Sequence, residues 1–389
     1  MRRFLPLLLL LLPIAACGDN GDKSGADGTL KVGLIVSLTG NYAPLGSEDS
    51  KSVQLAVQQI NSAGGLLGRK IELITKDDKS QPDQSVLAFN DLKGAGVAAV
   101  IGSPFSNSAL ATIPQVDREK IPYVSLTPAD EQVKPVHPYV FVVPATSATY
   151  ADRILQYYQA QGISKVAVAH DSRSSYANAG TAGMKAKAGQ YAVTLVADEQ
   201  FETTTTEFSA VLNHVRTSGA QALVVWATGP PAVAFAKQYA TAGLKLPLMF
   251  TGAQASSLWL KPTGPAAEGV YVASSIAVVG DALPAGAQKS AIEELSNPFT
   301  AQYGYPPPQF AADGYTGTKL LAAAVTKANS DDHAKIQQAF EGLTLTTPNG
   351  TYHYSATDHA GLTADYISVN VVKGGKFEAT DWAKGKLAG

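Results

Sequence analysis

Apolar runs of strand length alternate with helical stretches through the first part of the chain. Lys31–Val36 is a continuous apolar run, which is typical of a parallel strand buried on both faces. The stretch after it places Val53, Val57 and Ile60 on one face of a helix. Three further strand-like runs follow, separated by helical stretches: Ile71–Lys76, Val97–Ile101 and Ile121–Leu126. This alternation predicts a right-handed, doubly wound α/β sheet.

The same series of strands begins again about 120 to 135 residues later along the chain. Its members are Lys165–Ala169, Val193–Ala197, Ala222–Trp226 and Leu246–Phe250. The near-constant offset predicts two similar Rossmann-like lobes with a central cleft rather than one large sheet. A helical block follows at 285–342, and two β-rich runs close the chain. We therefore assign 29–144 plus 276–345 to the first lobe and 145–275 plus 346–389 to the second, with crossings that form a hinge.

Ligands of open α/β sheets bind at the carboxyl ends of the strands, where loops and helix N-termini converge. Two lobes that face each other across such edges can close on a small molecule. Six loops are expected to border this cleft: Ser37–Gly46, Gly102–Ser108, Thr127–Glu131, Asp171–Asn178, Thr228–Pro231 and Thr251–Ala255.

The N-terminal sequence predicts a targeting signal. Two arginines precede an apolar stretch with six consecutive leucines, too short to span a membrane as a helix, which predicts a secretory signal at 1–16. Ile14-Ala15-Ala16-Cys17 resembles the lipobox of bacterial lipoproteins, which implies lipidation of Cys17 and anchoring to a membrane at the periplasm or cell surface. A chance cysteine beside an anchor helix is the alternative. The Gly- and Asp-rich segment 17–28 is expected to be a flexible tether.

Composition and motifs exclude several classes of function. The formal net charge is −2 and no basic stripe occurs, so we expect no nucleic-acid partner. The chain has no Gly-x-Ser-x-Gly elbow, His-Glu-x-x-His pair or Gly-Lys-[Ser/Thr] phosphate loop. His353, Asp358 and His359 are expected to lie in a solvated turn rather than around a metal. We predict a protein that is not an enzyme and uses no cofactor or metal.

Several short motifs follow one another along the whole mature chain. They include Val32-Gly33-Leu34, Ser37–Gly40, Ala56–Asn61, Ile71-Glu72-Leu73, Val100–Ser103, Ile121-Pro122-Tyr123, Thr127-Pro128-Ala129 and Ala242-Gly243-Leu244. In order and spacing they resemble the periplasmic branched-chain amino acid (Leu/Ile/Val) binding proteins of ABC transporters, which have the type I periplasmic binding protein fold. The resemblance implies two lobes joined by three crossovers, which close on a small amino acid or similar solute and present it to a membrane permease.

The resemblance also assigns candidate ligand-binding residues. Ser106 matches the serine that binds the ligand carboxylate, and its place at the start of a predicted helix independently favours an anion. Ala129 stands where a backbone carbonyl faces the ligand ammonium. Tyr176 matches a tyrosine of the second lobe. Thr228 replaces an aromatic residue, and Trp226 lies two positions earlier.

Other positions depart from the family pattern and leave the ligand open. Glu131 replaces a threonine, and the second-lobe acid that pairs the ammonium falls near Gly252 or Gln254. Glu131 could supply the missing charge for an amino acid. Alternatively, the ligand is a carboxylate or amide without an amine, held by Ser106 and Arg173. Both charged residues could equally be solvated loop positions.

Four aromatic residues are candidates for lining an apolar pocket, although each is also a plausible core residue: Tyr42, Phe105, Trp226 and Phe310. Leu45 stands where the family commonly has another aromatic. Two other functions remain open beside transport. The same fold could report a ligand to a signalling partner, and a hydrolase is a more distant alternative.

Overall fold

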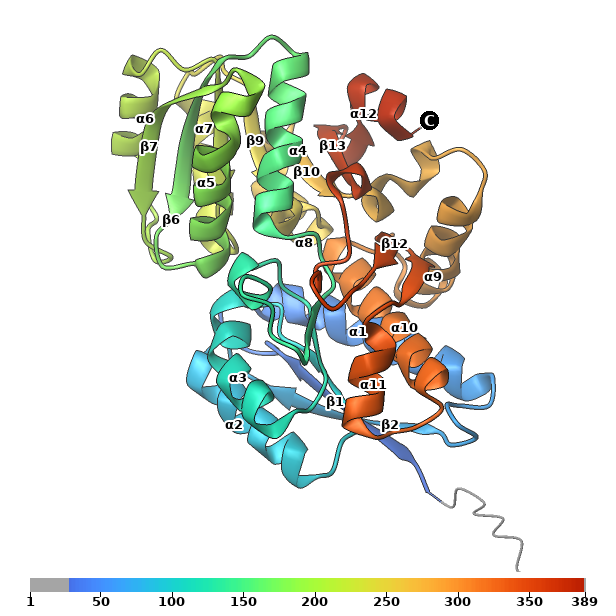
Figure 1. Cartoon of the computed structure of the whole chain (residues 1–389). Helices are drawn as coiled ribbons and strands as arrows, with labels where there is room; N and C mark the ends of the chain where they lie inside the picture. The colour runs from blue at the N-terminus through green and yellow to red at the C-terminus, as the bar shows by residue number, and fades with distance from the viewer. Residues whose placement is uncertain (1–27, 388–389) are drawn as a thin grey trace, which may run out of the picture.

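The computed structural model describes residues 28–387, so the predicted signal segment and Cys17 lie outside the described residues. The chain forms two lobes, each built on a sheet with helices on both faces (Figure 1). This architecture confirms the predicted α/β fold with two doubly wound lobes.

The first sheet has five parallel strands in the order β2-β1-β3-β4-β5. Their bounds are β1 Leu30–Val36, β2 Ile71–Asp77, β3 Val100–Gly102, β4 Tyr123–Ser125 and β5 Val140–Val142. Apolar side chains on alternate positions fill both faces, because helices cover the sheet on each side.

The second sheet repeats this order in its parallel part, β7-β6-β8-β9-β10, and is extended beyond β10 by the antiparallel strands β13 and β14, of which β14 forms the edge. The bounds are β6 Lys165–Asp171, β7 Thr194–Phe201, β8 Ala222–Trp226, β9 Leu248–Thr251, β10 Tyr271–Ser275, β13 Ile367–Lys373 and β14 Lys376–Ala379. The two lobes therefore share one strand order, as the repeated series of strands in the sequence predicts. The fifth parallel strand of each lobe was not predicted.

Helices cover the two faces of each sheet. In the first lobe, α1 (Ala43–Ser62), α10 (Gln309–Ala328) and α11 (His333–Phe340) pack on one face, and α2 (Pro82–Gly94) and α3 (Ser106–Glu119) on the other. In the second lobe, α4 (Ser147–Ala160) and α5 (Ser175–Lys187) oppose α6 (Ser209–Thr217), α7 (Pro230–Thr241) and α8 (Ser257–Thr263). The outer helix α9 (Ala287–Tyr303) packs against α1 and α10, and α12 (Asp381–Leu387) ends the chain.

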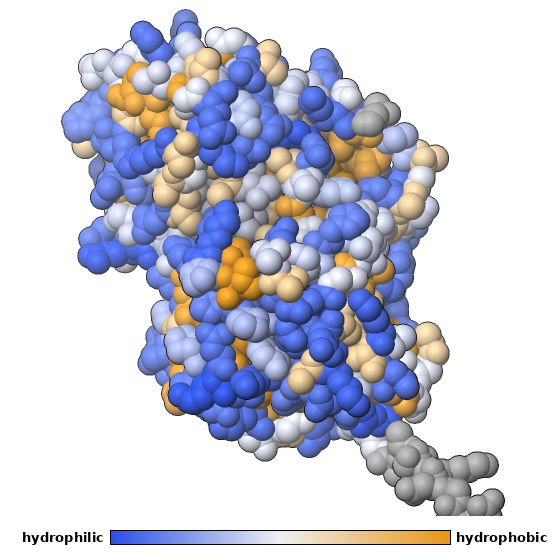
Figure 2. Space-filling view, in the orientation of Figure 1, coloured by the Kyte–Doolittle hydropathy of each residue, from blue (hydrophilic) through white to orange (hydrophobic). Residues whose placement is uncertain are grey.

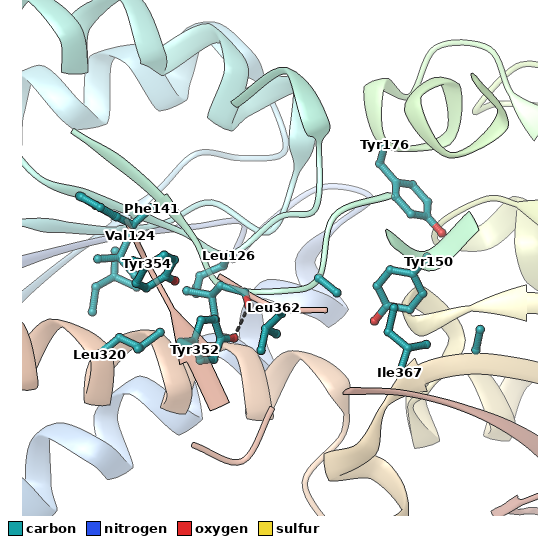
Figure 3. Packing of buried hydrophobic residues seen from close by; sticks show 14 of the residues in the cluster. Val124, Leu126, Phe141, Tyr150, Tyr176, Leu320, Tyr352, Tyr354, Leu362 and Ile367 are labelled. Atoms are coloured by element: carbon teal, nitrogen blue, oxygen red, sulfur yellow. Dashed lines mark hydrogen bonds between the residues drawn. The ribbon is translucent and has the colours of Figure 1, made fainter. Parts of the chain in front are cut away.

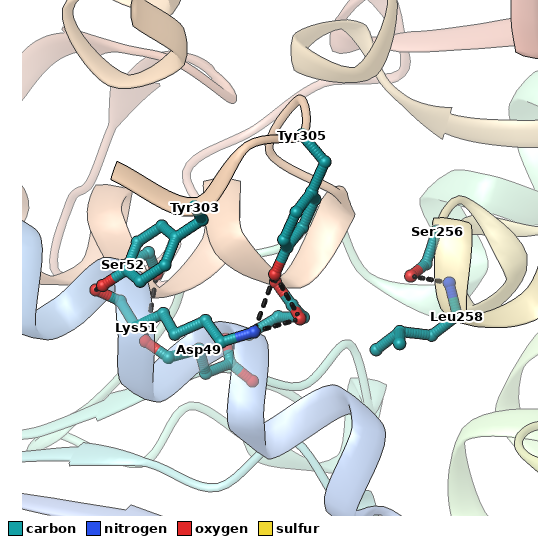
Figure 4. Close-up of polar contacts among 8 residues, drawn as sticks. Asp49, Lys51, Ser52, Ser256, Leu258, Tyr303 and Tyr305 are labelled. Atoms are coloured by element: carbon teal, nitrogen blue, oxygen red, sulfur yellow. Dashed lines mark hydrogen bonds and ion pairs between the residues drawn. The ribbon is translucent and has the colours of Figure 1, made fainter. Parts of the chain in front are cut away.

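Helices α1 and α10 pack in close contact within the first lobe. Gly314 lies so near α1 that a Cβ there would come 2.7 Å from the Asp49 carbonyl oxygen. Farther along, Lys51 Nζ donates to the Tyr305 hydroxyl at 2.7 Å and pairs with Glu48 at 2.9 Å (Figure 4). These contacts join the first helix of the lobe to the segment that leads into α10.

A hairpin near the C-terminus lies on the first lobe. Strands β11 (Thr344–Thr347) and β12 (Gly350–His353) form it, and the hydroxyls of Tyr352 and Tyr354 donate to the carbonyls of Val143 and Val142. We therefore propose to group residues 346–362 with the first lobe, whereas the predicted boundary after residue 345 assigned them to the second. The reason is that the sequence cannot show which sheet edge a short hairpin covers.

The largest apolar core passes through the hinge without a break. Figure 3 shows Phe141, Leu126 and Tyr352 on the side of the first lobe, and Tyr150 and Tyr176 on the side of the second. At the surface, Figure 2 shows mainly polar residues with small separate apolar patches on the visible face. Within residues 28–387, no helix has the length and apolar character needed to cross a bilayer.

Candidate ligand-binding cleft

The carboxyl ends of the two parallel sheets face each other and enclose a pocket, which we call the inner pocket. All six loops predicted to border the cleft contribute residues to it. The lining residues are Tyr42, Leu45, Pro104, Phe105, Ser106, Leu126, Thr127, Pro128, Pro144, Tyr150, Ser174, Tyr176, Thr228, Thr251, Gly252, Ala253, Gln309, Phe310 and Asp313.

Four helices begin at the inner pocket. Tyr42 and Ser174 are the N-cap residues of α1 and α5, and Ser106 and Gln309 are the first residues of α3 and α10. Because a helix N-terminus carries unpaired N–H groups and partial positive charge, this convergence favours a negatively charged group in the pocket.

Hydroxyl groups on both lobes meet at the pocket. Ser106 Oγ lies 2.5 Å from Thr127 Oγ1 in the first lobe, and the Tyr176 hydroxyl is hydrogen-bonded to Thr251 Oγ1 in the second. Burial raises the pKa of the Tyr176 hydroxyl, so this group stays neutral and available as a donor. These groups can hydrogen-bond a carboxylate or an amide without carrying a charge themselves.

An aromatic wall closes the apolar side of the pocket. The rings of Tyr42 and Phe105 stack with centroids 4.1 Å apart, and Leu45 and Phe310 complete the same cluster. Each of the four side chains is only 7–8 % exposed. These residues therefore both line the pocket and belong to the buried core. The sequence left open whether such residues serve one role or the other, and the two roles are compatible.

Asp313 is the one residue with a formal charge among the described residues that line the pocket. Burial raises the pKa of its carboxyl to about 7. Hydrogen bonds from Asn349 and Gln309 act in the opposite direction but have a smaller effect. Asn349 Nδ2 donates to Oδ1 at 2.7 Å, and Gln309 Nε2 donates to the same oxygen at 3.0 Å. No described lining residue is basic, so an anionic ligand would be held by dipoles and hydroxyls.

The structure brings together five of the residues predicted for the site and leaves three outside the lining. Ser106, Phe105, Tyr176, Thr228 and Phe310 line the inner pocket, whereas Ala129, Glu131 and Trp226 do not. Their roles as ligand contacts remain predictions.

Local packing explains why these three residues do not line the pocket. Glu131 is exposed on a one-turn helix, while the next residue, Gln132, turns inward and donates to the Ala129 carbonyl at 2.9 Å. Trp226 is fully buried behind Tyr176, with ring centroids 5.4 Å apart. Arg173, the other charged candidate, is exposed and pairs with Glu202 at 2.9 Å.

Sequence reasoning missed Tyr150, Gln309 and Asp313. All three lie on α4 and α10, the helices next to the hinge, rather than on the strand-end loops. An aspartate inside the apolar run from Phe310 to Tyr315 was the available signal, because a buried charge without a structural partner is rare.

Asn107 connects the two lobes at the edge of the cleft without lining the pocket. Its Nδ2 donates to the Arg173 carbonyl at 2.9 Å, and its Oδ1 accepts from the Ser175 amide at 3.0 Å. Ser175 is the first residue of α5, whose N–H has no partner within the helix. The two bonds exist only while the lobes are together, so Asn107 stabilises the closed form.

Comparison with known proteins identifies the family. The family model described as periplasmic binding protein matches residues 29–376. The chain belongs to this family. Its members are substrate-binding proteins of ABC transporters that act outside the cytoplasm, not enzymes, as the sequence predicted.

Individual relatives of this periplasmic binding protein are distant but match over nearly the full length. It is 25 % identical to a Leu/Ile/Val-binding protein homologue of Brucella melitensis, over 98 % of this chain and 99 % of that one. It is also 25 % identical to a leucine-, isoleucine-, valine-, threonine- and alanine-binding protein of Pseudomonas aeruginosa, covering 88 % and 89 %. An extracellular ligand-binding receptor from Rhodopseudomonas palustris has the same fold, with a TM-score of 0.83, 21 % identity and coverage of 91 % and 100 %.

Removing the Asn107 bridge should weaken ligand binding without touching the ligand. We expect Asn107→Ala to raise the Kd about five- to thirtyfold, because two hydrogen bonds, one exposed and one partly buried, of about 0.5–1 kcal/mol each are lost only from the closed form. Calorimetric titration gives the Kd, and small-angle scattering gives the fraction closed. Asn178→Ala is the matched control, since Asn178 bonds Ser172 within the second lobe. Equal affinities and equal scattering for Asn107→Ala and the wild type would show that Asn107 does not stabilise the closed form.

The buried Asp313 carboxyl predicts a pH dependence of stability. Its pKa of about 7 in the folded protein lies above the ordinary value of 3.8 for an aspartate carboxyl. The folded state therefore holds the proton more tightly, and stability falls as the pH rises from about 4 to about 7. Between pH 5 and pH 8 we expect the free energy of unfolding of the wild type to fall by roughly 2 kcal/mol. The Asp313→Asn variant should not show this decrease. Thermal or urea unfolding of both proteins across this range measures the difference. Parallel pH profiles would show that Asp313 is not the titrating group.

Proposed function

We propose that this protein is the solute receptor of an ABC importer, anchored to the membrane through lipid on Cys17. It takes a small amino acid, or a related carboxylate or amide, in the inner pocket and presents it to a membrane permease. The observation that carries the proposal is the inner pocket itself, in which four helix starts and neutral hydroxyls meet beside an apolar aromatic wall. Distant relatives named for binding aliphatic amino acids support the same class of solute.

In this proposal the ligand carboxylate binds at Ser106 and Thr127 on the first lobe. Both hydroxyls are buried within 2.5 Å of each other, at the first turn of α3. The second lobe then closes with Tyr176 and Thr228 facing the ligand. A carboxylate in this position exchanges its hydration for fixed donors and the partial positive charge of the helix ends.

Recognition of an ammonium, if the ligand carries one, falls to Asp313 rather than to Glu131. Asp313 is buried at the pocket, whereas Glu131 is exposed to solvent. A bound ammonium would lower the pKa of the Asp313 carboxyl and keep it ionised at neutral pH. Leucine and 4-methylpentanoate share one carbon skeleton and differ in the amine, so their relative affinities decide whether an amine is required.

Replacement of Ser106 tests the carboxylate position. We expect Ser106→Ala to weaken binding about 10- to 100-fold, because a hydrogen bond to a charged group contributes about 1.5–3 kcal/mol. Ser108→Ala is a matched control on the same helix: Ser108 is fully buried, does not line the pocket, and its hydroxyl has no partner among the described residues. Calorimetry with amino acids and their des-amino carboxylates measures both. If no compound of either class binds the wild type, the proposed function fails.

Replacement of Cys17 tests the anchor separately. We expect Cys17→Ser to abolish incorporation of labelled fatty acid and to release a soluble protein with unchanged ligand affinity, while uptake by the cell falls. The tether should raise the local concentration of receptor near its permease. Fractionation, labelling and calorimetry on the two forms measure these effects. A Cys17→Ser protein that stays in the membrane fraction would contradict anchoring through this residue.

A further inference from the structure

A second hollow adjoins the inner pocket, and we call it the outer groove. It runs between the Gly40–Leu45 segment of the first lobe and helices α7 and α8 of the second. Leu45, Ala253 and Phe310 line both the outer groove and the inner pocket. A molecule bound in the inner pocket can therefore extend past these three side chains into the outer groove.

The free space in this closed arrangement lies mostly in the outer groove. The inner pocket has a cavity volume of about 40 Å³, and the outer groove about 540 Å³. A volume of about 40 Å³ holds only a few water-sized groups, enough for a carboxylate head but not for a large side chain. The bulk of a larger ligand would have to leave the inner pocket through the shared residues.

The walls of the outer groove are mainly apolar. Val233 and Ala234 on α7 and Leu258 and Trp259 on α8 contribute to them. Leu258 is 40 % exposed, one of three exposed large hydrophobic residues in the described part of the chain. Figure 4 shows it projecting from the start of α8, beside Ser256, toward the side of α1. An exposed leucine at a hollow gains stability when apolar surface covers it.

We propose that the outer groove is a specificity subsite that takes a bulky apolar substituent of the ligand. The preferred substrates would be carboxylates with an aryl-alkyl or long alkyl group, larger than the side chains of branched-chain amino acids. This inference rests on the proposed function, because it needs the carboxylate head to bind at Ser106. Continuity with the inner pocket is what favours the ligand itself, rather than a protein partner, as the occupant.

A series of unbranched ω-phenyl carboxylates, from phenylacetate to 5-phenylpentanoate, tests the proposal by calorimetry. Burial of each added methylene should tighten binding about fourfold in the wild type. Ala234→Phe narrows the outer groove, and we expect it to weaken the longest member at least tenfold, with a loss that grows along the series from phenylacetate onward. Ala240→Phe is the matched control, on an exposed position of the same helix that does not line the groove.

A second variant guards against misfolding, since Ala234 packs partly on the core. Leu258→Asp places a charge at an exposed wall position and should reproduce the loss for long members with an unchanged melting temperature. Affinities that are flat along the series and insensitive to both variants, while Ser106→Ala still weakens binding, would overturn the outer groove alone. Uptake lost with binding intact would make the outer groove a permease surface and also overturn the proposal. No binding by any member of the series or by the amino acids would instead overturn the proposed function.

Discussion

A buried network around Asp313 fixes the paths of the chain between the two lobes. Gln309 Oε1 accepts from the Ser275 amide at 2.7 Å while its Nε2 donates to Asp313. Asn349 donates to the same carboxyl and accepts from Ser275 Oγ at 2.9 Å. The partners come from the end of β10, the start of α10 and the turn of the β11–β12 hairpin. A buried polar group left without its partner costs about 1–3 kcal/mol, so separate movement of any one of these segments is disfavoured by about that amount.

This network also forms part of the inner pocket, which links the hinge to the ligand. Tyr150 lies on α4 and lines the pocket, and its hydroxyl donates to Gln309 Oε1 at 3.4 Å. A ligand that changes the charge of Asp313 therefore acts on groups that hold the crossings in place. Binding and closure share these residues, so affinity depends on the closed population as well as on direct contacts.

The sequence predicted the fold well because parallel strands buried on both faces leave a simple signal. Runs such as Lys31–Val36 and Ala222–Trp226 are of strand length and rich in β-branched and aromatic residues, which favours a buried strand over a helix segment. The strand Val140–Val142 was missed although it lies in an apolar run, and although β3 and β4, which are equally short, were predicted from such runs. The cleft loops were predicted correctly, since the carboxyl ends of parallel strands define them whatever the side chains are.

Individual site residues were harder to predict because a single position decides which way a side chain points. Glu131 and Gln132 are neighbours, yet one is exposed and the other fully buried. Trp226 lies on the strand face that packs against α5, where Gly180 leaves room for its ring, and so it supports Tyr176 from behind. Helix periodicity gives no sign that Asp313 faces a pocket, because a cleft and a core both require an inward face.

The direction of β1 places the entry of the chain into the first lobe away from the inner pocket. The chain enters the first lobe at the amino end of this strand, near Leu30, whereas the inner pocket lies at the carboxyl ends of the same sheet. Figure 1 shows the first lobe with its N-terminal entry on the side away from the second lobe. A tether attached there would leave the cleft and the outer groove free to open, because each lobe moves as one unit together with its own sheet. The first crossing leaves β5 at its carboxyl end, on the opposite edge of the sheet from the entry near Leu30, so a tether of the proposed kind would not obstruct closure of the lobes.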